Sequence, residues 1–267
     1  MFYIPFAYYY VVRLGTLPKL LSWMLIYLMP TAFYSAVGYS GPWPLFALSY
    51  LLVLLATFSL YECGYIINDA VSIRREEQPA IRLYDRNLSH FARWQACILG
   101  ARLLYALTAL LCLYLLCRDT AVICHIGLAL LAMCLLFALY NRCRSRNNVW
   151  LYPLLVCSRY LPFLLLFPHP GTIYLLLFLS FPLLNALERF SMPRYRWPLM
   201  RTLIPDEPSK TRFRVAYYIL LVLITTPLIL LTEHSWEWLL PIYILCAYRI
   251  ALALWLRTHH PDNYLNG

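Results

Sequence analysis

The chain has 267 residues, of which 62% are hydrophobic and only 13% are charged, and its formal net charge is +10. In soluble domains about a quarter of the residues are charged. In this chain the apolar residues come in long runs. This composition excludes an ordinary soluble domain and indicates a membrane protein. Most basic residues lie between the apolar runs, as in cytoplasmic loops, so nucleic acid is not an expected partner.

Eight apolar runs are long enough to cross a bilayer, which takes about 20 helical residues. In chain order they cover residues 20–38, 43–67, 94–117, 120–140, 150–167, 171–190, 215–232 and 236–256. The sequence therefore predicts an all-α polytopic transmembrane bundle of about eight helices, in a single domain over residues 1–267.

The connections between these runs alternate between short segments and longer basic ones. With the N-terminus in the cytoplasm, 18 of the 22 Lys and Arg residues fall in cytoplasmic segments, and the opposite side receives only Arg118. Because Lys and Arg favour cytoplasmic loops, we expect both termini to be cytoplasmic. The expected location is a bacterial-type inner membrane or a plasma membrane.

The most charged stretch follows the second run and reads YECGYIINDAVSIRREEQPAIRLYDRN, residues 61–87. On a helix, Glu62, Asp69, Ser72 and Glu76 are spaced by seven, three and four residues, so they share one face. This stripe of oxygen atoms begins inside the membrane and reaches its cytoplasmic edge. Mg²⁺ prefers one or two carboxylates with waters and substrate phosphates, so the stripe predicts a Mg²⁺ site.

Four arginines follow the stripe at its cytoplasmic end: Arg74, Arg75, Arg82 and Arg86. Their guanidinium groups are suited to hold a diphosphate by charge-assisted hydrogen bonds. The other interpretation is a juxtamembrane loop of solvated ion pairs. Glu62 favours the functional interpretation, because an ionisable residue inside a span is costly and usually serves a function.

The sequence NDAVSIRREEQPAIRL resembles the first aspartate-rich motif of the UbiA superfamily of intramembrane prenyltransferases, Asn-Asp-x-x-Asp-x-x-x-Asp. Asn68 and Asp69 match this motif directly, while Ser72 stands at its second aspartate and Glu76 at its third. VRLGTLPKLLSWMLIYLMPTAFYSAVG is similar to the family's first helix, and ALYNRCRSRNNVWLYPLLVCSRYLPFLL to its fourth-to-fifth helix connection. The similarity covers residues 12–215.

The chain departs from the family pattern at the second motif, two aspartates four residues apart after the sixth helix. Residues 175–215 contain no such pair, and the nearest polar residues are Asn185 and Glu188 on one predicted helix face. Asp206 and Glu207 are adjacent, in a predicted loop. The family usually has nine helices, one more than the apolar runs counted here. The second metal site is therefore expected to be missing or rebuilt.

The resemblance implies Mg²⁺-dependent transfer of a prenyl group from an isoprenoid diphosphate to a small aromatic or lipid acceptor. It implies Asn68, Asp69 and Glu76 as catalytic residues, and Asp69, Glu76 and Glu188 as metal ligands. The predicted diphosphate-binding residues are Arg74, Arg75, Arg82 and Arg159. For Arg159, in the fifth run, the alternative is a side chain that snorkels to the membrane interface.

The sequence leaves four alternatives open. A branch of the same superfamily transfers a phosphoribosyl group from a ribosyl diphosphate to a polyprenyl phosphate, and isoprenoid cyclisation needs no acceptor. The alternative from a different class of protein is a transporter or a non-catalytic membrane partner. A transporter would place its charges near the middle of the bilayer and repeat its halves, whereas here the polar residues gather at the predicted cytoplasmic end.

Overall fold

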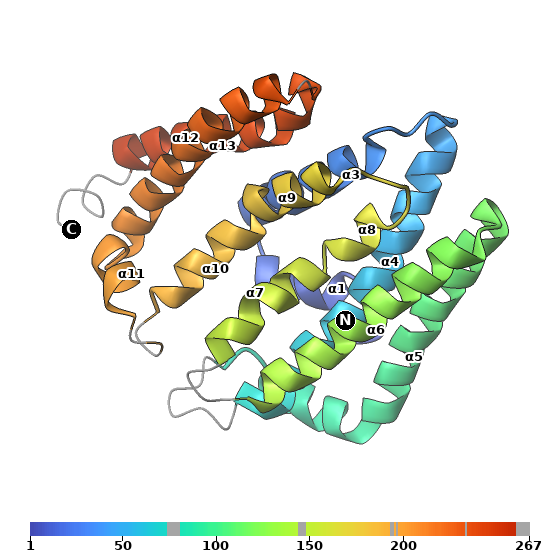
Figure 1. Cartoon of the computed structure of the whole chain (residues 1–267). Helices are drawn as coiled ribbons and strands as arrows, with labels where there is room; N and C mark the ends of the chain where they lie inside the picture. Colours follow the sequence, from blue (N-terminus) through green and yellow to red (C-terminus); the bar gives the residue numbers. More distant parts are fainter. Residues whose placement is uncertain (74–80, 144–147, 193–194, 196, 233, 260–267) are drawn as a thin grey trace. The chain divides into compact units, whose positions relative to one another are not determined.

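The structure is a computed structural model that describes residues 1–73, 81–143, 148–192, 195, 197–232 and 234–259 (Figure 1). These residues form helices and no β-strand, which confirms the predicted all-α class. They group into two compact units, Met1–Met24 with Gly38–Pro168 and Leu25–Val37 with His169–Gly267. The single transmembrane domain predicted for residues 1–267 stays a prediction.

The first unit is built around three long helices, α4 (Trp43–Ile67), α5 (Asp85–Cys117) and α6 (Thr120–Arg142). A π-helix, η3 (Asn68–Ser72), continues α4. The unit also contains the shorter elements α1 (Ala7–Tyr9), η1 (Tyr10–Leu14), α2 (Leu17–Trp23), α7 (Asn148–Ser158) and α8 (Leu161–Leu164).

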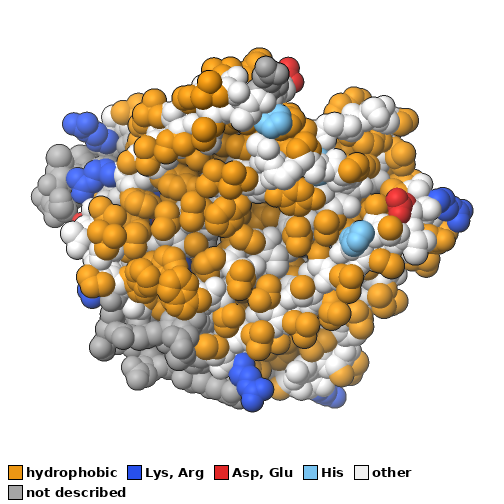
Figure 2. Space-filling view, viewed as in Figure 1, with side chains coloured by type: hydrophobic (Ala, Val, Ile, Leu, Met, Phe, Trp, Pro, Cys, Tyr) orange, Lys and Arg blue, Asp and Glu red, His pale blue; other side chains and the backbone are white. Residues whose placement is uncertain are grey.

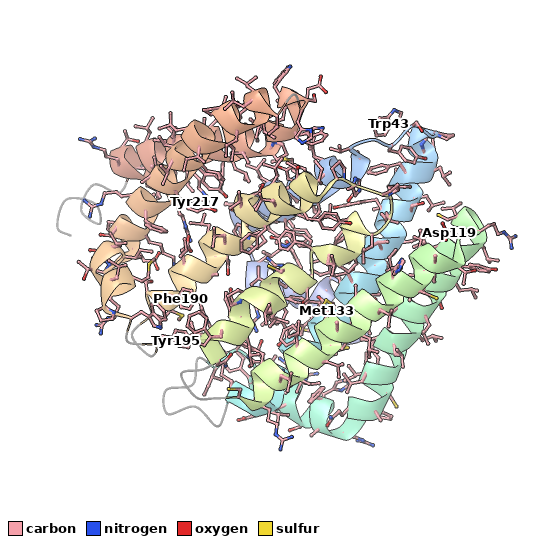
Figure 3. All side chains as sticks on the ribbon, in the orientation of Figure 1. Trp43, Asp119, Met133, Phe190, Tyr195 and Tyr217 are labelled. Atoms are coloured by element: carbon pink, nitrogen blue, oxygen red, sulfur yellow. The ribbon has the colours of Figure 1, made fainter. Side chains whose placement is uncertain are left out.

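A tight turn of two residues reverses the chain between α5 and α6. Arg118 ends α5 in the left-handed conformation, with φ 56°. Asp119, labelled in Figure 3, caps α6 by accepting hydrogen bonds from the backbone N–H groups of Ala121 and Val122 at 2.9 and 3.1 Å. Such a cap satisfies backbone N–H groups that have no partner within the helix. Arg118 and Asp119 thus end one helix and begin the next within two residues, so the local sequence directs α6 back antiparallel to α5.

Close contact between α4 and α6 depends on a glycine. A Cβ atom added at Gly64 would overlap the ring of Phe137 on α6. Asn141, near the end of α6, donates from Nδ2 to the Gly64 carbonyl at 3.0 Å. The missing side chain at Gly64 therefore lets the Phe137 ring rest against the backbone of α4.

The second unit contains α3 (Met29–Ala36), α9 (Gly171–Ser180), α10 (Pro182–Phe190), α11 (Pro198–Leu203), α12 (Glu207–Leu231), η6 (Trp236–Leu239) and α13 (Leu240–His259). The π-helix η2 (Met24–Leu28) leads into α3. Tyr217, labelled in Figure 3, and Tyr218 on α12 donate from their hydroxyls to the carbonyls of Leu179 and Ser180, both at 2.5 Å. These bonds hold α12 against the end of α9.

Five helices of the described part are long and apolar enough to cross a membrane: Trp43–Ser72, Asp85–Cys117, Thr120–Arg142, Glu207–Leu231 and Trp236–His259. Two bent pairs raise the count to seven if each is one span: Ala7–Leu14 with Leu17–Ala36, bent by 114°, and Gly171–Ser180 with Pro182–Phe190, bent by 41°. By length and composition, the chain is an integral membrane protein. A count of eight or nine spans stays a prediction.

The surface agrees with this conclusion. Figure 2 shows a face on which hydrophobic side chains predominate and Lys and Arg side chains are few. On α5, Leu104 and Leu111 are exposed by 65% and 57%, and on α6 Leu128 is exposed by 63%. Large apolar side chains at such exposure are suited to lipid rather than to water.

The predicted span over residues 150–167 is not a single helix. It is divided into α7, which ends at Ser158, and α8, which begins at Leu161. Pro162 lies in the first turn of α8, where its missing N–H costs nothing, whereas inside a continuous helix it would remove a hydrogen bond and clash with the preceding turn. Proline therefore explains why the helix restarts here.

Candidate functional site

Asp69 lies at the centre of the candidate site, in the π-helix η3 that continues α4. Its side chain is fully buried in the first unit. Short π-helical stretches inside α-helices often occur at functional sites. A buried carboxylate must be paired or hydrogen-bonded to stay ionised, so the partners of Asp69 define what the site can do.

The N-terminal segment, residues 1–14, supplies the strongest partners of Asp69. Arg13 Nη2 donates to both carboxylate oxygens, at 2.7 Å to Oδ1 and 2.6 Å to Oδ2. The hydroxyl of Tyr8 donates to Oδ2 at 2.8 Å. The Arg13 guanidinium also lies 4.4 Å from the centre of the Tyr65 ring, a cation–π contact.

Two residues from the predicted motif region complete this set. Asn68 Nδ2 donates to Asp69 Oδ1 at 3.0 Å, and Arg82 Nη1 approaches the same oxygen at 3.4 Å. Together with Tyr8 and Arg13 they form what we call the Asp69 cluster: Tyr8, Arg13, Asn68, Asp69 and Arg82. In this cluster two guanidinium groups face one buried carboxylate, so the cluster carries excess positive charge.

Glu62, the other acidic residue of the stripe, has a different set of partners. It is fully buried. Its carboxylate accepts hydrogen bonds from the backbone N–H of Phe6 at 2.9 Å and of Tyr9 at 2.7 Å, and it pairs with Arg102 of α5. Arg102 Nε in turn donates to the carbonyl of Phe2 at 2.7 Å. In this structure Glu62 anchors the N-terminal segment to α4 and α5.

Sequence reasoning did not find the roles of Tyr8 and Arg13. The partners are 61 and 56 residues from Asp69 along the chain, so no local pattern joins them. The signal in the sequence was a lone arginine after the aromatic opening MFYIPFAYYYVV. An isolated cation beside so much apolar surface requires a partner when it is buried.

Ser72, at the position of the family's second aspartate, is buried and lines a groove between η3 and α6. Glu76, Arg74 and Arg75 lie outside the described residues. Of the site residues predicted in the motif region, the structure thus brings Asn68, Asp69 and Arg82 together.

Arg159 lies between α7 and α8 and is only 7% exposed. Its guanidinium is 5.1 Å from the ring centre of Tyr160 and 5.6 Å from that of Tyr61, and its Nη2 donates to the Tyr160 hydroxyl at 3.3 Å. Tyr61 lies on α4, about two turns before Asp69. Arg159 is therefore held by aromatic rings inside the first unit rather than exposed in the way that a snorkelling side chain would be.

Glu188, the expected remnant of a second metal site, lies on α10 in the second unit. Arg214 of α12 donates to its two carboxylate oxygens from Nε at 2.6 Å and from Nη2 at 2.7 Å. This is the bidentate geometry in which arginine binds carboxylates most strongly. In the described structure, the charge of Glu188 is matched by Arg214.

The Asp69 cluster fits Mg²⁺ only together with a phosphate-bearing ligand. No group of three or more His, Cys, Asp and Glu side chains that could hold a metal ion occurs among the described residues. Mg²⁺ is often held by one or two carboxylates plus substrate phosphates and waters, and Asp69 supplies one carboxylate. Because Arg13 donates to both of its oxygens, Arg13 would have to turn to the phosphates first.

Comparison of the chain with protein-family models, with curated proteins and with solved structures finds no match. The fold and the site define an all-helical membrane protein with a buried aspartate held by two arginines.

Proposed function

We propose that this chain is a divergent UbiA-type membrane transferase. It would move a prenyl group from an isoprenoid diphosphate to a small aromatic or lipid acceptor. The observation that carries this proposal is the Asp69 cluster, in which Arg13, Arg82 and Asn68 converge on a buried carboxylate at the end of an apolar helix. The resemblance of Asn68 and Asp69 to the family motif supplies the type of reaction.

The excess positive charge of the cluster supports binding of a diphosphate. Arg13 and Arg82 now share one carboxylate, and a diphosphate offers more oxygen atoms and more negative charge than Asp69 does. Guanidinium groups bind phosphate through paired, charge-assisted hydrogen bonds. Arg74 and Arg75 lie outside the described residues, in the sequence that follows η3. We propose that they also donate hydrogen bonds to the diphosphate.

When Arg13 turns to the phosphates, the Asp69 carboxylate becomes available for a cation. Asp69, with Glu76 from outside the described residues, would then hold Mg²⁺. A bound Mg²⁺ supplies positive charge that stabilises the departing diphosphate. In the transfer, the carbon–oxygen bond to the diphosphate breaks, the acceptor forms a bond to the allylic carbon, and the acceptor loses a proton.

The proposed orientation places the Asp69 cluster at the cytoplasmic side, with both termini in the cytoplasm. The support is the distribution of charge, since 18 of 22 basic residues fall on one side of the predicted topology. A soluble diphosphate head would reach the cluster from the cytoplasm, while its isoprenoid tail stays among the apolar helices.

The test is release of diphosphate by the purified full-length protein, with and without Mg²⁺. One set of assays uses a series of isoprenoid diphosphates as donors. A second assay uses a ribosyl diphosphate as donor and a polyprenyl phosphate as acceptor, so the two sets distinguish prenyl transfer from phosphoribosyl transfer. We expect Mg²⁺-dependent release from an isoprenoid donor, and loss of Mg²⁺-dependent donor binding in Asp69→Asn.

Asp119→Asn is the matched control, because it removes one carboxylate far along the chain and asparagine also caps helices well. It should retain full activity and donor binding. If the folded wild-type protein neither binds nor turns over any donor, the transferase proposal is wrong.

A further inference from the structure

Arg249 is a buried arginine in the middle of a membrane-spanning helix of the second unit. It lies on α13, ten residues before this helix ends at His259, which is roughly 15 Å along the helix axis. Only 5% of the residue is exposed, so its guanidinium is enclosed by protein rather than by lipid or water. A charged side chain at this depth is costly and indicates a functional site.

Arg249 has little to balance its charge. Within the residues that the structure describes, it forms no ion pair with a carboxylate, and its buried Nε has no hydrogen-bond partner. The ring of Tyr248 lies beside it, with the ring centre 5.3 Å from the guanidinium carbon. A buried charge requires an opposite charge or several hydrogen bonds. One aromatic ring does not provide these, so Arg249 can bind an anion.

Two other charged side chains act on Arg249, namely Arg214 of α12 and Glu188 of α10. In the second unit, α12 packs against both α13 and α10 (Figure 1). Glu188 accepts two hydrogen bonds from Arg214, at 2.6 and 2.7 Å. These three residues, which we call the Arg249 cluster, therefore hold two positive charges and one negative charge. A ligand with a single negative charge would make the cluster neutral.

The Arg249 cluster is accessible at the pair formed by Arg214 and Glu188. Their side chains are 24% and 12% exposed, whereas Arg249 is more deeply buried. Arg214 uses Nε and Nη2 to bind Glu188, and its Nη1 donates to no other described residue. An anion that enters beside the pair would therefore find a free donor on Arg214 and the unbalanced charge of Arg249.

We infer that the Arg249 cluster binds the carboxylate of an amphiphilic acid, a molecule with one carboxylate and an alkyl tail. A carboxylate carries one charge and fits the planar guanidinium group, as Glu188 does with Arg214. An alkyl tail suits the surroundings, since Leu245, one turn before Arg249 on the same face of α13, is fully buried. The cluster lies in the second unit and Asp69 in the first, so this inference goes beyond the proposed transferase function and does not rest on it.

Four ligands test the inference on the full-length protein in a neutral detergent. Octanoate has the carboxylate and the tail, acetate has the carboxylate alone, 1-octanol has the tail without charge, and octyl phosphate carries a phosphate instead. Equilibrium dialysis of labelled ligand, with protein-free micelles as the blank, measures binding. We expect octanoate to bind about ten- to a hundredfold more tightly than octanol, the range for a hydrogen bond to a charged group.

The other two ligands decide the chemistry of the anion and the role of the tail. Acetate should bind more weakly than octanoate, because it has no tail to place among the apolar side chains. Equal binding of acetate and octanoate would overturn the inference, because the site then takes a small free anion. Tighter binding of octyl phosphate than of octanoate would overturn the carboxylate as the group that is recognised.

A matched pair of variants on α13 assigns the ligand to this cluster. Arg249→Met removes the buried charge and should lower the affinity for octanoate to that for octanol, a loss of about ten- to a hundredfold. Arg257→Met removes the same charge from an exposed position about two turns later. This control should keep the wild-type affinity for octanoate.

Stability distinguishes a binding role of Arg249 from a structural one. Without ligand, Arg249→Met should unfold at or above the wild-type midpoint, because it removes a buried cation that has no carboxylate partner. A lower midpoint together with unchanged octanoate binding would overturn the inference. If Arg249→Met does not fold, Arg249→Gln removes the charge and keeps a polar group. Wild-type affinity for octanoate in either variant overturns the inference, as does equal binding of octanoate and octanol by the wild-type protein.

Discussion

Arg13 Nη2 lies 2.7 Å from Oδ1 and 2.6 Å from Oδ2 of Asp69, so a single guanidinium nitrogen reaches both oxygens of this buried carboxylate. The side chain of Arg13 is 18% exposed and that of Asp69 is fully buried. The pair joins the N-terminal segment to the end of the second predicted span. Both the local fold and the proposed donor site therefore depend on the same contact.

Arg13→Gln should destabilise the protein because it takes away the strongest donor to a buried carboxylate. We expect a loss of about 1.5–3 kcal/mol in the free energy of unfolding, the range for a hydrogen bond to a charged group. Arg82 and Tyr8 remain as partners of Asp69, which keeps the loss below that of a buried carboxylate with no partner. Thermal unfolding of the purified protein in detergent measures the effect.

The double variant Arg13→Gln with Asp69→Asn measures the interaction energy of this pair apart from the other contacts that each side chain makes. Since both charges are then removed, its loss should be smaller than the sum of the two single losses. Strict additivity would mean that Arg13 and Asp69 do not interact in the folded protein.

Arg102→Met should be more damaging, because Glu62 would remain buried without its cationic partner. Removing one member of a buried ion pair costs about 3–5 kcal/mol. Glu62 also anchors the backbone of Phe6 and Tyr9, so we expect the N-terminal segment to become sensitive to protease. Limited proteolysis with mapping of the cleavage sites, beside a thermal unfolding curve, checks both effects.

Adding Glu62→Gln to Arg102→Met should recover part of the lost stability, because no buried charge is left and the amide oxygen still accepts from one of the two backbone N–H groups, Phe6 or Tyr9. Arg201→Met removes an exposed arginine and should change stability little. An intact, protease-resistant N-terminal segment in Arg102→Met would contradict the role given to Glu62.

How much of this fold the sequence could predict depends on the range of the interactions. The spans that contain α4, α5, α6, α12 and α13 were predicted, because a long apolar run indicates a membrane helix whatever it packs against. The run over residues 150–167 is also long and mostly apolar, yet its helix is broken before Pro162. Hydropathy measures the preference for lipid and is insensitive to a missing N–H group.

The site was predictable only where its residues are close in sequence. Asn68 and Asp69 were identified by their motif, and they do contact each other. Tyr8 and Arg13 reach Asp69 from a distant segment, and Arg214 reaches Glu188 across 26 residues. These contacts are set by tertiary packing, which a single sequence does not reveal. The metal-binding roles of Glu76 and Glu188 stay predictions.

Gly64→Ala should destabilise the protein because its methyl group would overlap the Phe137 ring. Overpacking of this kind costs about 1–3 kcal/mol. Gly100 on α5 is the matched control, since a Cβ there would meet nothing within 4 Å, and alanine favours a helix over glycine by about 0.5–1 kcal/mol. Thermal unfolding should therefore show a lower midpoint for Gly64→Ala and an equal or higher one for Gly100→Ala.

Phe137→Leu combined with Gly64→Ala should restore part of the stability, because the smaller side chain gives way to the added methyl group. If Gly64→Ala alone unfolds at the wild-type temperature, α4 and α6 do not meet as closely at this point as the structure has them.

The start of α12 should loosen in acid. Asp206 caps this helix by accepting a hydrogen bond from the backbone N–H of Ser209 at 2.6 Å. Hydrogen bonds from the Ser209 side chain and backbone hold the pKa of Asp206 below its usual value. A carboxyl group whose pKa is lowered by folding stabilises the folded state above its unfolded pKa, and that contribution is lost as the pH falls through the folded pKa.

Amide hydrogen exchange at Ser209 measures this cap directly. After correction for the intrinsic rate, protection should be full near neutral pH and should fall as Asp206 becomes protonated in acid. Asp206→Asn keeps an acceptor that does not titrate, so its protection at Ser209 should not change over the same pH range. A fall of equal size in Asp206→Asn would show that another group controls the start of α12, because the only difference between the two proteins is the carboxylate at the cap.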